Sequence, residues 1–281
     1  MSARTGTGEQ PNYFSRLSAL LLTSAKQLVR PPSHSRRAEA ARRYARHALL
    51  LTAILGAAVL ALMYVLDTIE IGLMPPRGTA SLWPLRILTD FGKDDYVLLA
   101  LAGLLCAVAV TAPRLRGTAR SLWLNFGTRL QFLFLAVLLP VLVGEVLKFA
   151  IGRGRPFVGG KADAFNFVPF SGGGAYASLP SGHAITAAAL AFAVAALWPQ
   201  TRVAMIVYAA LILMTRLVLL AHHPSDVVAG ALLGVVGAML VRYWFAARRL
   251  AFVIRQDGAI APLPGPSPEQ LKRVAREAFA P

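Results

Sequence analysis

Cysteine and acidic residues are scarce in this 281-residue chain. Its single cysteine, Cys106, lies within an apolar run, which excludes an intramolecular disulfide and a metal site built from cysteines. Only 13 residues are Asp or Glu, against 29 Lys or Arg, so the formal net charge is +16. That balance is typical of a nucleic-acid-binding protein, or of a membrane protein whose basic residues hold its loops in the cytoplasm.

Long apolar runs favour the membrane protein. Hydrophobic residues make up 56% of the chain, and their runs alternate with short basic clusters. A helix needs about 20 mostly apolar residues to cross a bilayer core of about 30 Å. The sequence therefore predicts an all-α integral membrane bundle of six transmembrane helices and argues against nucleic-acid binding. The six runs are 47–66, 96–112, 130–150, 184–198, 203–221 and 227–245, of which the fourth is short unless it begins near Ser181.

The flanking charges predict the orientation of these helices. Basic clusters precede the first run at 36–46, follow the second at 114–129 and begin the tail at Arg248, which places all three in the cytoplasm. The loop at 67–95 balances its basic residues with acidic ones and is expected outside. We therefore expect a basic cytoplasmic segment at 1–46, a membrane domain at 47–247 and a cytoplasmic tail at 248–281. No cleavable signal peptide is expected, because the first apolar stretch is short and strongly basic residues follow it.

Three further segments have distinctive patterns. Residues 82–91 carry apolar side chains at helical spacing, which predicts a short helix on the membrane surface or over a site. Residues 152–180 contain too many Gly, Pro and Phe for a membrane span, so we expect a long, ordered outer loop of the kind that usually serves a function. Residues 17–29 predict either an amphipathic helix on the membrane or a disordered tail.

Polar residues gather at the outer ends of the predicted helices, in three stretches that are far apart in the sequence. Ionisable groups are costly at membrane depth, so such a cluster indicates a functional site. The residues are Lys148, Arg155, Ser181, Gly182, His183, Arg216, His222 and Asp226.

The charges in this cluster predict a phosphate ligand. Lys148, Arg155 and Arg216 have one clustered acid, Asp226, so they need an external anion. Arginine forks match phosphate oxygens and lysine adds a compact charge. Backbone N–H groups of Ser181 and Gly182, at the start of a helix, can bind the same oxygens. We expect no metal and no cofactor, because these cations supply the charge stabilisation.

The two histidines supply the reactive groups. His222 and Asp226 are four residues apart, and Pro224 between them suits a first helical turn, so the carboxylate is expected to orient the imidazole. His222 would then attack phosphorus and form a phosphohistidine. His183 would protonate the leaving group and afterwards activate water.

These blocks resemble the three-part signature of the type 2 phosphatidic acid phosphatases, a superfamily that includes vanadate haloperoxidases and bacterial acid phosphatases. The blocks are KFAIGRGRP at 148–156, PSGH at 180–183 and TRLVLLAHHPSD at 215–226. The resemblance implies phosphate binding by Lys148, Arg155, Ser181, Gly182 and Arg216, and catalysis by His183, His222 and Asp226. Thr215 departs from the usual Ser, but a hydroxyl group remains.

The resemblance also implies a substrate class. It is a phosphorylated membrane lipid: phosphatidic acid, phosphatidylglycerol phosphate, undecaprenyl diphosphate or lipid A. Because the site is expected to face outward, we expect the substrate to be a bacterial envelope lipid. The protein is then expected in the inner membrane, with its site toward the periplasm. The oligomeric state is not predicted.

Each feature alone also has an ordinary structural explanation. A lysine such as Lys148 often extends from a span end to the headgroups, and Ser181 suits a helix cap. Glu145 lies one turn before Lys148 and is as well placed for an ion pair as for catalysis. Two other functions stay open: a vanadate-dependent haloperoxidase, which the apolar spans disfavour, and a membrane carrier that binds phospholipid without hydrolysis.

Overall fold

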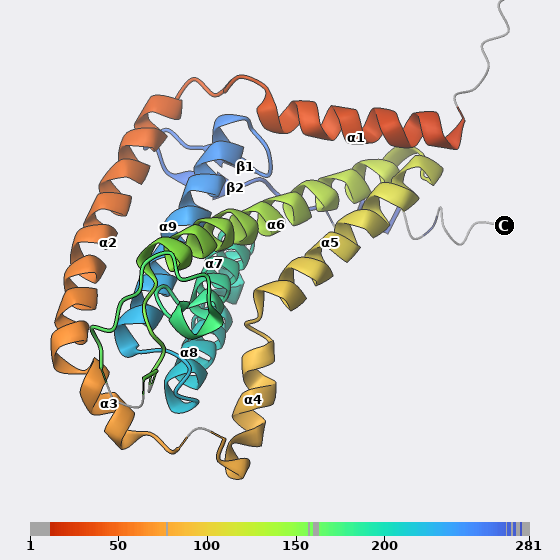
Figure 1. Ribbon diagram of the computed structural model, residues 1–281. Coiled ribbons are helices and arrows are strands. Elements are labelled where there is room, and N and C mark those ends of the chain that lie inside the picture. Colours follow the sequence, from red (N-terminus) through yellow and green to blue (C-terminus); the bar gives the residue numbers. More distant parts are fainter. Residues whose placement is uncertain are drawn as a thin grey trace, which may run out of the picture.

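A computed structural model describes residues 12–76, 78–156, 158–159, 163–267, 269–270, 272–273 and 276. Parts of the expected N-terminal segment and tail, at 1–11, 268, 271, 274–275 and 277–281, therefore lie outside the described residues. The described chain is mainly helical, with one small antiparallel sheet (Figure 1). The all-α membrane bundle expected from the sequence is confirmed.

Each of the six apolar runs lies mostly in a helix. The helices are α2 (Arg37–Val65), α5 (Asp94–Thr111), α6 (Gly117–Ile151), α7 (Gly182–Leu197), α8 (Arg202–Val218) and α9 (Pro224–Ala247). Five of the corresponding helical segments are long and apolar enough to cross a membrane, whereas α7 has 16 residues. Helix α2 begins well before its apolar run, because the preceding Ala, Glu and Arg residues are strong helix formers.

The remaining elements lie around this bundle. Residues 17–29 form part of a helix, α1 (Tyr13–Val29), and the short helix expected at 82–91 is α4 (Trp83–Asp90). Helix α3 (Asp67–Leu73) follows α2, and a hairpin of β1 (Phe252–Ile254) and β2 (Ile260–Pro262) follows α9. Short 3₁₀ turns complete the chain at Ala80–Leu82, Ala112–Arg114, Gly174–Tyr176 and Pro199–Thr201.

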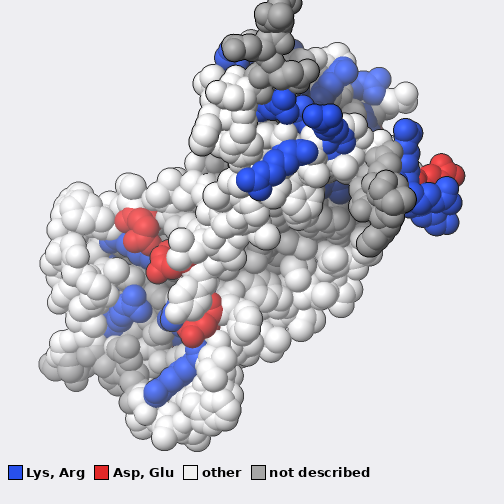
Figure 2. All heavy atoms as spheres, turned by 90° about the vertical axis from the view of Figure 1, so that its right-hand side faces the viewer, with Lys and Arg blue, Asp and Glu red and all other residues white. Residues whose placement is uncertain are grey.

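The surface of the bundle is that of a membrane protein. Figure 2 shows charged side chains gathered at the two ends of the visible face, with a broad uncharged band between them. Large apolar side chains point outward on several helices, as Leu49, Ile54 and Leu60 do on α2. Outward-facing apolar side chains and an uncharged band between two charged ends fit contact with lipid.

Helices α7 and α9 pack closely in the centre of the bundle, with α6 and α8 beside them. The approach depends on two glycines of α9. A Cβ atom at Gly230 would lie 2.5 Å from the carbonyl oxygen of Ser181, and one at Gly234 would lie 2.4 Å from that of Ile185. Small residues let helix backbones approach in this way within membranes. This contact holds the start of α9 beside the start of α7, where Ser181 N–H donates to the Asp226 carbonyl at 3.0 Å.

Replacement of Gly234 by alanine should destabilise the protein. The added methyl group must push α7 and α9 apart, at a cost of about 1–3 kcal/mol. Gly103→Ala in α5 is the matched control, because its added Cβ would meet no atom within 4 Å. We expect the detergent-solubilised Gly234→Ala protein to melt several degrees below Gly103→Ala. Equal or reversed melting temperatures would contradict close packing at Gly234.

Candidate active site

A long loop brings the end of α6 toward the starts of α7 and α9. Gly152 ends α6 with φ 60°, and a Cβ there would lie 1.8 Å from the carbonyl oxygen of Val168, so only glycine fits. The loop then folds back on itself: Val168 N–H donates to the Gly152 carbonyl at 2.7 Å, and Gly154 N–H donates to the Asn166 carbonyl at 2.8 Å. These backbone hydrogen bonds hold together the described parts of the loop expected at 152–180.

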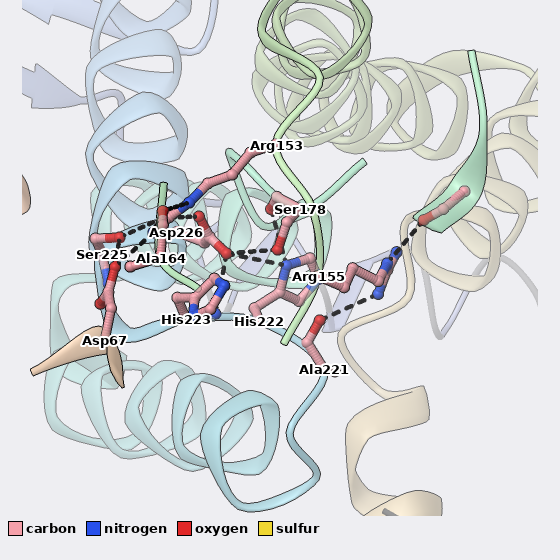
Figure 3. Close-up of polar contacts among 11 residues, drawn as sticks. Asp67, Arg153, Arg155, Ala164, Ser178, Ala221, His222, His223, Ser225 and Asp226 are labelled. Atoms are coloured by element: carbon pink, nitrogen blue, oxygen red, sulfur yellow. Dashed lines mark hydrogen bonds and ion pairs between the residues drawn. The ribbon is translucent and has the colours of Figure 1, made fainter. Parts of the chain in front are cut away.

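A fully buried arginine, Arg153, ties this loop to two other parts of the chain (Figure 3). Its Nη1 lies 2.6 Å from Asp226 Oδ1, and its Nη2 lies 2.7 Å from Asp67 Oδ2. It also donates to the Ser225 hydroxyl and to the Ala164 carbonyl. A buried guanidinium is stable only when it is paired and hydrogen-bonded in this way.

Asp226 is fully buried and lies in the first turn of α9. Oδ1 binds Arg153, while Oδ2 accepts hydrogen bonds from the Ser178 hydroxyl at 2.6 Å and from the His223 backbone N–H at 2.9 Å. The last contact satisfies a backbone donor at the helix start. Asp226 therefore connects the loop, the N-terminus of α9 and the histidine pair.

The ring of His222 is held by a backbone carbonyl, which differs from the sequence-based expectation. Nδ1 lies 2.8 Å from the Ser178 carbonyl oxygen, and Asp226 Oδ2 is 3.9 Å away. The carboxylate is too far for a hydrogen bond because Arg153, Ser178 and the His223 N–H already occupy it. Since a carbonyl only accepts, Nδ1 carries the proton and Nε2 of the neutral ring keeps its lone pair.

The surroundings of His222 favour that neutral ring. Burial, followed by the positive charges of Arg155 and Arg216, lowers the pKa of His222 well below 6.5. The Ser178 carbonyl opposes this shift. An unprotonated imidazole at neutral pH is what a nucleophile needs.

The three predicted cations lie around the histidines. Arg155 donates to the Gly174 carbonyl at 2.9 Å and to the Ala221 carbonyl, next to His222, at 3.2 Å. Arg216 is buried and its Nη1 donates to the Thr89 hydroxyl at 2.7 Å.

Lys148 approaches the start of α7 and forms an ion pair. A Cβ added to Gly182 would lie 3.0 Å from Lys148 Nζ, so glycine leaves room for the ammonium group. Lys148 also pairs with Glu145, one turn earlier on α6, which was one of the two roles expected for that acid.

Two buried polar atoms at the start of α7 have no hydrogen-bond partner within the described part of the chain. They are the hydroxyl of Ser181, a fully buried residue, and Nε2 of His183. The charges of Arg216, Lys93, Lys148 and Arg155 all act on the His183 ring. Buried donors without partners beside several cations suit an anionic ligand. The eight residues singled out from the sequence are therefore brought together at one end of the bundle.

Sequence reasoning missed several residues of this site. Arg153 is the first arginine of the RGR stretch, and the pattern alone does not show which arginine turns inward. Asp67 directly follows the first apolar run, and an acid at that position could have been recognised as a site candidate. Nothing in the sequence distinguishes Ser178 or Ser225 in this way. Glu70, also buried, lies near Asp67 and Asp226; burial and those two negative charges raise its pKa to about 7.

Comparison with known proteins agrees with this arrangement. The PAP2 superfamily model matches residues 129–250, which include all eight predicted site residues. A lipid A 1-phosphatase of Rhizobium johnstonii is 38% identical over 180 residues, which are 62% of this chain and 71% of the relative. The chain belongs to the PAP2 superfamily. A lipid A 1-phosphatase of Rhizobium etli is 37% identical over 180 residues, 62% of this chain and 75% of the relative. No solved structure matches the chain significantly.

Membership of the PAP2 superfamily, together with the apolar helices, makes the protein a membrane lipid phosphatase, and hence a hydrolase. The sequence-based recognition of this family is confirmed.

Replacement of Arg153 and replacement of Arg155, both in the loop after α6, should differ in their effect on stability. Arg153→Met leaves the carboxylates of Asp67 and Asp226 buried without their cation, which costs about 3–5 kcal/mol. Arg155→Met removes donors to two backbone carbonyls and should cost about 1–2 kcal/mol. Thermal unfolding in detergent compares the two variants. If Arg153→Met melted no lower than Arg155→Met, the buried network would not be a major source of stability.

The lowered pKa of His222 predicts how stability changes with pH. Below pH 6.5 the unfolded chain protonates this histidine while the folded protein does not, so its contribution to stability is complete above 6.5. That contribution is lost as the pH falls from 6.5 toward the folded pKa, by up to about 1.4 kcal/mol per pH unit. Melting temperatures between pH 8 and pH 5 should therefore fall more steeply for the wild type than for His222→Gln. Parallel curves would contradict the depressed pKa.

Proposed function

We propose that this PAP2 protein removes a phosphate group from an envelope lipid at the outer face of the bacterial inner membrane, through a phosphohistidine at His222. The observation that carries the proposal is the state of the His222 ring. Nδ1 carries the proton and donates it to the Ser178 carbonyl, so a lone pair remains on Nε2 in a site surrounded by cations.

In the first step, Nε2 of His222 attacks phosphorus and the bond between phosphorus and the leaving oxygen breaks. His183 gives its proton to that oxygen. The negative charge on the equatorial oxygens is stabilised by Lys148, Arg155 and Arg216. The phosphorylated ring becomes cationic, and Asp226 at 3.9 Å from Nδ1 stabilises it without taking its proton.

In the second step, a water molecule attacks the phosphohistidine and gives its proton to His183. The nitrogen–phosphorus bond breaks, inorganic phosphate leaves and His222 regains its lone pair. The same phosphate oxygens bind the Ser181 hydroxyl and the backbone N–H of Gly182 at the start of α7. The Ser181 hydroxyl supports this role, since it is buried and has no other partner among the described residues.

Lipid A is the substrate we propose first among the four candidate lipids. Both Rhizobium relatives are named lipid A 1-phosphatases, and each aligns over most of its own length. The basic residues that flank α2 and α6 support cytoplasmic termini and a site that faces the periplasm, where a lipid of the outer leaflet can reach it. In this arrangement residues 47–247 form the phosphatase domain, between the cytoplasmic segments 1–46 and 248–281.

Phosphate release tests the proposed function. Purified protein in mixed micelles should release inorganic phosphate from lipid A with EDTA present, because side-chain cations supply the charge that a metal would give. His222→Gln should reduce release by at least about 10³-fold, since nucleophile and base work as a unit. Release from lipid A should exceed release from phosphatidic acid, phosphatidylglycerol phosphate and undecaprenyl diphosphate.

The covalent intermediate separates this mechanism from its rivals. Rapid acid-free quenching with ³²P-labelled lipid should label the wild type on histidine and leave His222→Gln unlabelled. His223→Gln is the matched control for the adjacent ring and should still be labelled if it folds. Undiminished turnover in His222→Gln would refute the nucleophile. Binding without any phosphate release would favour a carrier, and peroxide-dependent halogenation with vanadate would favour a haloperoxidase.

A further inference from the structure

Helix α4, which lies outside the residues matched by the PAP2 model, is fixed against the active site. The Thr89 hydroxyl accepts a hydrogen bond from Arg216 and lies 3.0 Å from the Thr215 hydroxyl. At the end of the same helix, the Tyr208 hydroxyl donates to the Phe91 carbonyl at 2.8 Å. Gly92 packs so closely that a Cβ there would lie 2.4 Å from Ile212. The position of α4 relative to α8 is therefore well determined.

Helix α4 also carries a further arginine, Arg86, toward Arg216. Arg86 lies three residues before Thr89 and hence on the same face of α4. A cavity of about 270 Å³ is lined by Arg86 from α4 and by Arg216 from α8. Its other lining residues are Gly78, Leu82, Leu219 and Ala221.

The cavity adjoins the proposed phosphate site. Ala221 lies in its wall, and the Ala221 carbonyl accepts a hydrogen bond from Arg155. Arg216 also lines the cavity, and its positive charge acts on the rings of His183 and His222. A molecule whose phosphate lies at His222 can therefore extend into this cavity.

The charge and size of the cavity define what it can hold. It has two guanidinium groups and no acidic residue among its described lining, which suits an anionic ligand. Its volume is near the lower end of the range for ligand pockets, about 300–1,000 Å³. The leucine side chains suit the apolar face of a sugar or prenyl unit. A headgroup fragment fits, while the lipid tails stay in the bilayer.

We propose that Arg86, in the cavity beside Arg216, forms a second anion site, which binds a second phosphate group of the lipid headgroup. This inference rests on the proposed function and adds a preference for substrates with two phosphates. The second phosphate is either at the far end of a disaccharide, as in lipid A, or directly bonded to the first, as in a prenyl diphosphate. Both sources present the same chemistry to Arg86.

Matched lipids and an Arg86 variant test the second site. Lipid A with both phosphates is compared with lipid A that carries only the 1-phosphate, so tails and sugars are the same. Arg86→Gln should lower kcat/KM for the two-phosphate form by about tenfold, mainly through KM, and change the one-phosphate form by less than about twofold. Arg86→Lys keeps the charge and should retain part of the preference. Undecaprenyl diphosphate, in a third arm, tells whether an adjacent phosphate also uses the site.

Control variants separate a local from a general effect. Arg120→Gln removes an exposed arginine on α6 far from α4 in sequence and should leave the preference unchanged. Equal losses on both forms of lipid A, or no loss on any of the three lipids, would overturn the second site while phosphate release continues. If Arg86→Gln lowered kcat/KM for undecaprenyl diphosphate but for neither form of lipid A, the result would support the site and assign it to adjacent phosphates. If the wild type released no phosphate from any lipid, the proposed function itself would fail.

Discussion

The buried contact of Arg153 with Asp67 and Asp226 is the interaction on which the site depends. It joins three segments that are far apart in the sequence: the start of α3, the loop after α6 and the first turn of α9. Burying three charges is costly, and the cost is met only because each group has several hydrogen bonds. The network therefore exists in one geometry, and that geometry places Ser178 and His222 together.

The site separates two kinds of positive charge. Arg153 is neutralised inside the protein by carboxylates and does not face a ligand. Lys148, Arg155 and Arg216 surround the histidines, where their charges act on the rings. The hydrogen bonds to the carboxylates of Asp67 and Asp226 come from Arg153, Ser178, Ser225 and backbone N–H groups. Arg153, paired inside the protein, and Arg155, which we propose binds phosphate, thus lie two residues apart in one loop.

The sequence predicted the helices and the site residues through different signals. Apolar runs gave the six helices, since burial in lipid requires their length, although helix starts such as that of α2 depended on propensity beyond the runs. Residue type identified Lys148, Arg155 and the histidines, because ionisable groups are costly at membrane depth and indicate a functional site there. Ser178 could not be found, because its role depends on its backbone carbonyl, which every residue possesses. The inward turn of Arg153 depends on the loop fold.

The contact between Ser178 and His222 also bears on how the proposed nucleophile would work. A carboxylate in hydrogen-bond contact would bind the protonated imidazole strongly and raise its pKa, which would disfavour the free lone pair at neutral pH. The neutral carbonyl fixes the same tautomer with a smaller effect of this kind. Asp226 remains at 3.9 Å, close enough to stabilise a ring that becomes cationic on phosphorylation. In the proposed mechanism the carbonyl orients the ring and the carboxylate compensates its charge, so each can be present without weakening the proposed attack on phosphorus.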